Sequence, residues 1–488
     1  MQQSPSCQKT LNLKIVSDKD HALTSFSSNV GIIKKPSFAI DLPRANMIEI
    51  NARLSSMKTS LIRYFEIDVR RTSIRRELIA GLTTYITMAY IVVINPTMMN
   101  LAGMDYDASF TATCFAAAIA TFAMGVVANW PVALAPGVGL SAFFTYTVVG
   151  ELGYSWQVAL GAVFLSSILF IAISATPLRK WILASVPKNL RFAIAAGIGL
   201  FIGFIGLKNS GIVVSNSASY VTLGDLASAE TFLGLLSFLL IAVLSIRRIP
   251  GAIILGIASI TFLSIILGKV EYSGWISRPP SLTPIFLELD VLGAMNVGMI
   301  SVVLAFLFVN LFDTAGTLFA VADNAKLTDG NNDIANLSAA LKTDSLSSMM
   351  GTFLGCAPVT SYVESSAGVS AGGRTGLTAV FTALFFCLTI FMSPLTSMVP
   401  AYATAGALIY VAVIMLSGLQ NLDWHDQTEL VPALITVIMI PMSFSIADGI
   451  AIGFISFAVI KTFTGKSQQV PYVAWALSAL FVLKFIFI

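Results

Sequence analysis

Two carboxylates stand in polar, glycine-rich stretches of otherwise apolar segments. Asp313 lies in NLFDTAGT (310–317), and Glu364 lies in PVTSYVESSAGVSAGG (358–373). An ionisable side chain at membrane depth costs several kcal/mol, so it is by default a candidate functional residue. We therefore interpret Asp313 and Glu364 as two parts of one buried site, able to accept hydrogen bonds from a polar ligand and to carry a proton.

The first stretch has the spacing of one helix face. Asn310, Asp313 and Thr317 recur at intervals of three and four residues. Gly316 beside them lets another backbone approach. A polar face of this kind is unstable against lipid, so it must face protein or a cavity. A structural seam that joins two helices is the alternative, but the carboxylate favours a functional site.

The second stretch does not have the pattern of a spanning helix. Pro358 blocks a regular helix and glycines follow, so we predict a strand and then a half-helix that begins near Ser365 or Ser366. Glu364 at the junction can accept two N–H hydrogen bonds from a polar heterocycle. Free backbone N–H groups of the half-helix can donate to a carbonyl oxygen of that ligand. The alternative, that Glu364 only caps the half-helix, would not exclude contact with a substrate.

A similar short segment occurs in the first half of the chain, APGVGLSAFF (135–144). Gly139 permits close backbone approach and Ser141 contributes a hydroxyl. Phe143 or Phe144 is a candidate for stacking on a planar ligand, although packing is the commoner role of aromatics in membrane segments. In the second half, Lys342 and Asp344 are predicted to form a structural ion pair near the end of their helix.

The composition indicates an integral membrane protein. Of 488 residues, 56% are hydrophobic and 11% are charged, and the mean hydropathy is +0.84. The net charge of +3 is small and gives no nucleic-acid-binding patch. The four cysteines are scattered without a CxxC pair, so we expect no metal, redox centre or cofactor. The only histidines, His21 and His425, lie in polar segments, so carboxylates must carry any coupled protons.

Apolar segments fall into two series that match in order. Each series has a short, glycine-rich third member, entered through Ala135-Pro136 in one half and Ala357-Pro358 in the other. The first series comprises 79–98, 107–128, 134–149, 157–175, 191–208, 230–246 and 250–268. The second comprises 298–321, 337–355, 359–371, 376–397, 401–418, 429–446 and 448–464, and a terminal apolar tail follows at 473–488.

An odd number of spans in each half requires the halves to be inverted relative to each other. We therefore predict an all-α polytopic membrane protein, a seven-plus-seven inverted-repeat transporter with about 14 transmembrane segments. Two of these segments are short and broken into a strand and a half-helix. The repeats cover 79–268 and 298–464, and the tail at 465–488 can hold one extra helix.

The N-terminal residues are predicted to lie outside the membrane. Residues 1–56 are mixed polar and are expected to be a disordered extension, and 57–78 form an amphipathic, basic lead-in. Lysines and arginines favour a cytoplasmic N-terminus, whereas Lys269 and Arg278 fall on the other side and the loop at 419–428 has neither Lys nor Arg. The residues that support this orientation are Arg70, Arg71, Arg75, Arg76, Arg179, Lys180, Lys188, Arg247, Arg248, Lys326, Arg374, Lys461 and Lys466.

Five stretches resemble the AzgA-like purine permeases, a branch of the nucleobase/ascorbate transporter superfamily. The resemblance covers about residues 60–488, and its most specific part runs from Glu-Ser-Ser-Ala-Gly to Gly-Gly-Arg-Thr-Gly-Leu. The stretches are TTYITMAYIVVINP (83–96), APGVGLSAFFTYTVV (135–149), LFDTAGTLFAVAD (311–323), TSYVESSAGVSAGGRTGLTAV (360–380) and SFSIADGIAIGFISF (443–457).

This resemblance implies a core domain made of spans 1–4 and 8–11 and a gate domain made of spans 5–7 and 12–14. It implies import of adenine, guanine or hypoxanthine across the plasma or inner membrane, by proton symport and alternating access of the elevator kind, in a protein that is often a homodimer. It makes Glu364 the base-binding carboxylate and Asp313 the proton-linked group. The further substrate contacts would be Asn310, Ser141, Gly139, Phe144 and Ser365.

Two positions depart from the family pattern. Ser141 stands where the family usually has Asn, and Asn310 replaces the first residue of Asp-x-x-Asp. The amide removes one potential proton carrier and can donate as well as accept hydrogen bonds. The preferred purine and the proton stoichiometry therefore stay open, and the alternative is another heterocycle such as uracil, xanthine or urate.

Other classes of function fit the sequence less well. A carrier of an inorganic anion such as sulfate should present Arg or Lys at the site, whereas this chain presents Glu364 and Asp313. No HExxH or GxSxG motif occurs, so we do not expect an enzyme. A channel would not need carboxylates on broken segments.

Overall fold

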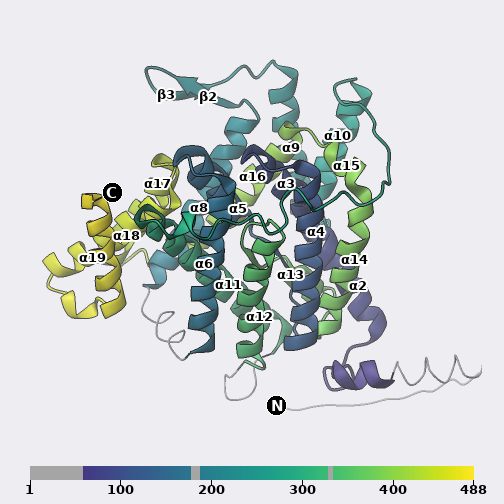
Figure 1. Cartoon of the computed structure of the whole chain (residues 1–488), viewed down its shortest axis with the longest axis horizontal. Helices are drawn as coiled ribbons and strands as arrows, with labels where there is room; N and C mark the ends of the chain where they lie inside the picture. Colours follow the sequence, from purple (N-terminus) through teal and green to yellow (C-terminus); the bar gives the residue numbers. More distant parts are fainter. Residues whose placement is uncertain (1–58, 177–186, 328–333, 488) are drawn as a thin grey trace, which may run out of the picture. The chain divides into compact units, whose positions relative to one another are not determined.

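The computed structural model describes residues 59–176, 187–327 and 334–487. The predicted extension at 1–56 and the basic pair Arg179 and Lys180 lie outside these residues. Within them, nine helices are long and apolar enough to cross a membrane, and three shorter apolar helices accompany them. The predicted all-α polytopic membrane protein is therefore confirmed (Figure 1).

The elements follow the predicted apolar segments. The first part of the chain forms α2 (Ile74–Met88), α3 (Ile91–Leu101), α4 (Tyr106–Ala123), the π-helix η1 (Met124–Ala128), β1 (Leu134–Pro136), α5 (Val138–Ala142), the π-helix η2 (Phe143–Glu151), α6 (Trp156–Ala175), α8 (Lys188–Asn209), β2 (Val213–Asn216), β3 (Tyr220–Leu223), α9 (Ala229–Ile246) and α10 (Ala252–Ile266). The second part forms α11 (Ile300–Ala325), α12 (Leu337–Phe353), β4 (Val359–Ser361), α13 (Ser365–Ser370), α14 (Gly376–Thr389), α15 (Ser393–Ser397), α16 (Ala401–Leu416), α17 (Gln427–Met442), α18 (Ile446–Phe463) and α19 (Tyr472–Phe487).

The two short segments meet at a pair of strands. Strand β1 pairs antiparallel with β4, with Leu134 opposite Ser361 and Pro136 opposite Val359. Each strand leads into a helix, and α13 begins at Ser365 as the sequence predicted. Short strands suit this place because proline and glycine prevent a continuous helix, and the partner strand supplies the backbone hydrogen bonds that lipid cannot.

The first spanning helix is also interrupted. Helices α2 and α3 are separated by Ala89 and Tyr90, and Pro96 within α3 cannot donate a backbone hydrogen bond to the preceding turn. Tyr90 is only 2% exposed, so the interruption places an aromatic hydroxyl inside the protein.

The helices pack in two sets. One set comprises α2, α3, α4, α6, α11, α12 and α14 with the short segments, and the other comprises α8, α9, α10, α16, α17 and α18. Between the sets, α10 touches α2, and α11 touches α8 and α18. Figure 1 shows α17, α18 and α19 together on one side and α2 with α14 on the other.

The terminal segment forms α19, which runs antiparallel along α18. The Ser478 hydroxyl donates to the carbonyl of Phe454 at 2.9 Å, and Lys484 pairs with Asp448 near the start of α18. At the other end of α18, the buried Lys461 pairs with Glu429 at 3.2 Å. The negative charge at the start of α17 thus neutralises the positive charge at the end of α18.

A buried carboxylate that the sequence analysis missed joins α2 to α14. Glu77 is fully buried and accepts hydrogen bonds from the backbone N–H groups of Arg374 (3.0 Å) and Thr375 (3.3 Å), and from the hydroxyl of Thr378.

We expect Glu77→Ala to lower the free energy of unfolding by about 3 kcal/mol, because it leaves these buried donors unsatisfied. Thermal unfolding in detergent measures the loss, and Glu230→Ala in the exposed first turn of α9 is the control. Equal unfolding temperatures for the two variants would contradict the expectation.

Candidate functional site

Glu364 lies between β4 and α13, where the strand pair meets the half-helix. Its side chain makes no capping hydrogen bond to α13, so capping does not account for the carboxylate. Instead, Oε1 accepts a hydrogen bond of 2.6 Å from the hydroxyl of Tyr90. The interruption between α2 and α3 therefore holds the half-buried carboxylate of Glu364 in place.

Asp313 lies near the middle of α11, the longest helix of the described chain. Its side chain is exposed, although many protein atoms lie around the carboxyl group. A Cβ added at Gly316, one turn further on, would meet no atom within 4 Å, so the prediction that another backbone approaches this glycine was wrong. Ala320 and Asp323 continue the exposed face, so accessible space follows α11 from Asp313 toward its end.

The two carboxylates lie close enough to influence each other, and their role in one site stays a prediction. Asp313 interacts electrostatically with Glu364 and with Asp344, and Tyr90 interacts with both Glu364 and Asp313. The interruption at Tyr90, the short segment at Glu364 and the continuous helix α11 at Asp313, far apart in sequence, thus present two acidic groups and a hydroxyl to one region. Such a region can accept N–H hydrogen bonds from a neutral ligand, and it would repel an anion.

Asp344 does not form the predicted ion pair with Lys342. The Asp344 carboxylate is fully buried and accepts hydrogen bonds of 2.6 Å from the hydroxyls of Ser361 and Thr314. Lys342 is exposed. The prediction was wrong because residues two apart on a helix point to different faces. Asp344 instead ties α12 to β4 and α11, directly behind the site.

Asn310 belongs to the same seam between α11 and α12. It is 1% exposed, and its Nδ2 donates to the Ser348 hydroxyl at 3.1 Å. Its Oδ1 is buried without a hydrogen-bond partner in the described part of the chain. Thr317, on the same predicted face, is also buried. Only Asp313 of that face reaches accessible space, and a contact between Asn310 and substrate stays a prediction.

The first short segment is held tightly by its neighbours. The Ser141 hydroxyl donates to Asn95 Oδ1 at 2.6 Å, and Asn95 in turn donates to the Thr113 hydroxyl at 2.8 Å. This bond uses the hydroxyl proton of Ser141, so a ligand would find only an acceptor there. A Cβ added at Gly139 would lie 2.7 Å from Ile198 of α8, so this glycine allows the short segment to approach the second set of helices.

The remaining predicted contacts are also buried. Phe144 is fully buried, and Ser365 accepts a hydrogen bond of 3.0 Å from the backbone N–H of Ala133, which fixes α13 beside β1. Within the described ranges, no group of three His, Cys, Asp or Glu side chains is arranged to hold a metal ion. The roles of Ser141, Gly139, Phe144 and Ser365 as substrate contacts stay predictions.

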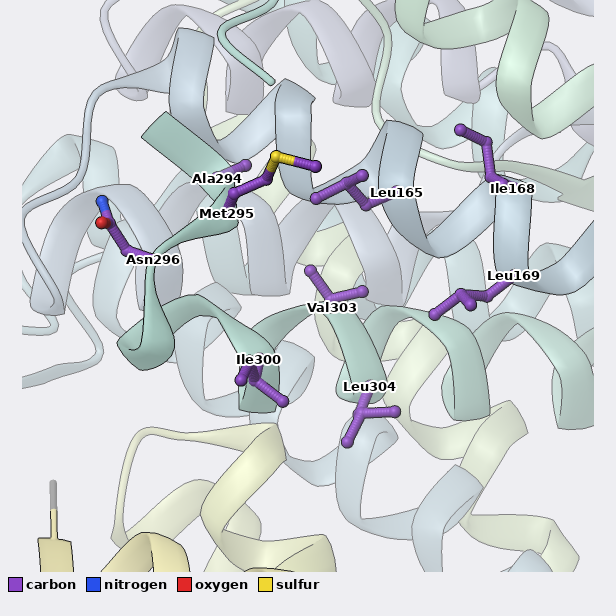
Figure 2. Close-up of a pocket in the computed structure, with 9 residues that line it drawn as sticks. All are labelled: Leu165, Ile168, Leu169, Ala294, Met295, Asn296, Ile300, Val303 and Leu304. Carbon is purple, nitrogen blue, oxygen red and sulfur yellow. The ribbon is translucent and has the colours of Figure 1, made fainter. Parts of the chain in front are cut away.

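The depression shown in Figure 2 is a different place. It lies between α6 and residues 294–304, which include the start of α11, has a volume of about 440 Å³, and has Asn296 as its one polar lining residue. None of the candidate site residues lines it. An apolar hollow of this kind does not provide hydrogen-bonding groups for a polar heterocycle.

Residues 75–452 match the model of a permease family, Xan_ur_permease. The chain belongs to this family. The permease is 47% identical over 428 residues to the adenine permease AdeP of Escherichia coli (strain K12), covering 88% of this chain and 96% of the relative. It is 40% identical to the guanine/hypoxanthine permease PbuO of Bacillus subtilis (strain 168), covering 86% and 99%. It is 33% identical to the nucleobase transporter PlAzg2 of Paenibacillus larvae, covering 79% and 77%.

Solved structures support the fold. The transmembrane domain of the cyanobacterial bicarbonate transporter BicA superposes with a TM-score of 0.59 at 17% identity, covering 77% of this chain and 96% of that domain. SLC26A9 superposes with a TM-score of 0.58 at 13% identity, covering 88% and 73%. The permease therefore has a helical membrane-transporter fold and is not an enzyme, and the predicted relationship to AzgA-like nucleobase permeases is confirmed.

Proposed function

We propose that the permease imports purine nucleobases, namely adenine, guanine or hypoxanthine, together with protons. The observation that carries this proposal is the Glu364 carboxylate, which accepts the hydrogen bond from Tyr90 beside the paired strands and lies close enough to Asp313 for the two charges to interact. Relatives at 40–47% identity are named for adenine and for guanine and hypoxanthine. A neutral heterocycle with N–H donors matches this acidic region, whereas bicarbonate or another anion does not.

The transport mechanism that we propose is alternating access of the elevator kind. The first set of helices would form the core, which carries the substrate, and the second set would form the gate. The pairing of β1 with β4 at equivalent places in the two halves supports a seven-plus-seven inverted repeat of fourteen spans. We further propose an inner or plasma membrane location, a cytoplasmic N-terminus and a homodimer.

Tyr90 would position the substrate-binding carboxylate. Its hydroxyl occupies one lone pair of Glu364 Oε1, which leaves Oε2 free to accept an N–H group from the base. A hydrogen bond to a charged group contributes about 1.5–3 kcal/mol. Without this hydrogen bond, the Glu364 side chain would sample other rotamers. Part of the free energy of purine binding would then be spent on ordering it.

Tyr90→Phe is therefore expected to raise the KM for purine uptake about tenfold with little change in Vmax. The matched control is Tyr85→Phe on the same interrupted span, which removes a hydroxyl that bonds to Thr389 at 2.7 Å. Uptake kinetics at equal surface expression measure both variants. A KM for Tyr90→Phe no higher than that of the control would show that Tyr90 does not position Glu364.

Asp313 would carry the coupled proton. Burial among protein atoms favours the neutral form of a carboxyl group, and protonation would remove a charge before the core moves. Asp313→Asn fixes a neutral side chain, so we expect purine accumulation that no longer responds to an imposed pH gradient. The measurement is uptake into proteoliposomes with and without an inward proton gradient. Accumulation that still follows the gradient would exclude Asp313 as the proton carrier.

The second candidate substrate class is another heterocycle, namely uracil, xanthine or urate. Ser141 and Asn310 favour this alternative, because both depart from the family pattern at positions that we predict to contact substrate. Competition by unlabelled uracil, xanthine and urate against labelled adenine, guanine and hypoxanthine distinguishes the two classes. Stronger competition by the first group would move the proposal to that class.

A further inference from the structure

An unpaired lysine lies on the outer face of α12. Lys342 is exposed, and no carboxylate in the described ranges forms an ion pair with it. It lies five residues after the start of the helix, or about 8 Å along the axis at ~1.5 Å per residue. An isolated ammonium at this depth is costly unless it reaches the headgroup region or a bound anion.

Lys342 borders a groove between α4 and α12. The groove has a volume of about 800 Å³, and exposed apolar side chains form much of its wall, including Ile119 (44% exposed), Val127 (61%) and Leu346 (49%). Asn336 and Ser338 line it near the start of α12. The groove therefore has a polar, cationic end and an apolar length.

The neighbouring contacts fix the direction of this groove. The Asn336 amide donates to the carbonyl of Ala128 at 3.2 Å, and the Trp130 indole donates to the carbonyl of Ala335 at 2.8 Å. The end of η1 thus lies beside the start of α12. The polar end of the groove, at Asn336 and Ser338, is therefore at the ends of these helices, and the apolar part runs away from it along α12. Lys342 lies between the two parts, and its long side chain can extend toward headgroups at the polar end.

We propose that this groove binds one anionic phospholipid, with its phosphate on Lys342 and an acyl chain along the apolar wall. The charge and the groove match the two parts of such a lipid. The depression in Figure 2 is apolar but has no charged lining residue, so it would not distinguish an anionic lipid from a neutral one.

The opposite face of α12 carries the contacts behind the substrate site. Asp344 and Ser348 bond to α11 and β4 from that face. A lipid in the groove would stabilise the packing of α12 against α4, and through α12 the positions of α11 and β4 beside the substrate site. This inference goes beyond the proposed substrate and does not depend on it.

Native mass spectrometry and thermal unfolding of the full-length protein test the inference, with phosphatidylglycerol and phosphatidylcholine as the two added lipids. We expect the wild type to retain phosphatidylglycerol preferentially and to unfold at a higher temperature with it. Lys342→Gln should lower the affinity for phosphatidylglycerol about fivefold and remove the difference between the lipids. Lys342→Arg should keep it. Lys326→Gln, which removes an exposed charge outside the groove, is the control.

Leu346→Trp fills the apolar part of the groove and should reduce retention of phosphatidylglycerol, whereas Leu169→Trp in the depression of Figure 2 should not. Equal retention of the two lipids by the wild type would overturn the proposal. So would a Lys342→Gln variant that behaves like Lys326→Gln. Dimers that dissociate in Lys342→Gln or Leu346→Trp would assign the groove to a second copy of the chain instead.

Discussion

Glu364→Gln is expected to lower Vmax/KM for purine uptake by about 100-fold or more, with normal insertion in the membrane. The carboxylate has two acceptor oxygens, one held by Tyr90, whereas glutamine has one acceptor oxygen and an NH₂ group. The variant must either lose the bond to Tyr90 or turn its NH₂ group toward the N–H of the base. Loss of one charge-assisted hydrogen bond together with an unsatisfied donor costs about 3 kcal/mol, which corresponds to this factor.

The control for this variant is Glu429→Gln at the start of α17, whose carboxylate pairs with Lys461 away from the site. Initial rates of uptake of labelled adenine, guanine and hypoxanthine at matched expression give the comparison. We expect the control to stay within about threefold of the wild type, because the buried Lys461 keeps Asp426 (3.6 Å) and Gln469 (3.0 Å) as partners. A Glu364→Gln variant with near-normal Vmax/KM for all three bases would remove this residue from the substrate site.

Gly368→Val is expected to abolish transport and to lower the unfolding temperature sharply. Gly368 lies in α13 against α2, and a Cβ there would collide with the Thr84 hydroxyl and lie 2.7 Å from the carbonyl oxygen of Ala80. A backbone carbonyl within a helix cannot move aside as a flexible side chain can. The half-helix must therefore separate from α2, and Glu364 at its start would move away from Tyr90.

Gly418→Val provides the matched control, because a Cβ at Gly418 would meet no atom within 4 Å. Thermal unfolding in detergent and uptake in cells should both stay near wild-type values for the control. Active transport by Gly368→Val would show that the close contact between α13 and α2 is not required, and with it the fixed position of Glu364 would be in doubt.

The local parts of the site could be predicted from the sequence. Proline and glycine near Glu364 exclude a spanning helix, so the strand and the start of α13 at Ser365 follow from local rules. The cost of a charge in the membrane singles out Asp313 and Glu364 without any knowledge of packing. The structure adds that the two carboxylates lie close enough to interact, which supports the interpretation that they belong to one site.

The long-range contacts could not be predicted in this way. Tyr90 and Glu364 are 274 positions apart, and tyrosine is common in membrane segments, so nothing local indicates their bond. The one sequence signal for a functional role of Tyr90 is the family resemblance of residues 83–96, TTYITMAYIVVINP, which contain it. The sequence predicts Lys342 as the partner of Asp344 because the two are neighbours in the chain, whereas hydroxyls of Thr314 and Ser361 from two other elements bond to the carboxylate.

The most direct test of the proposed function is uptake of labelled adenine, guanine and hypoxanthine by cells that lack their own purine carriers, with and without a protonophore. We predict saturable uptake of at least one base, abolished by the protonophore and by Glu364→Ala. No uptake of any of the three bases by well-expressed wild-type protein would contradict the assignment of purines as substrates. Saturable uptake that persists in the protonophore would contradict the coupling to protons.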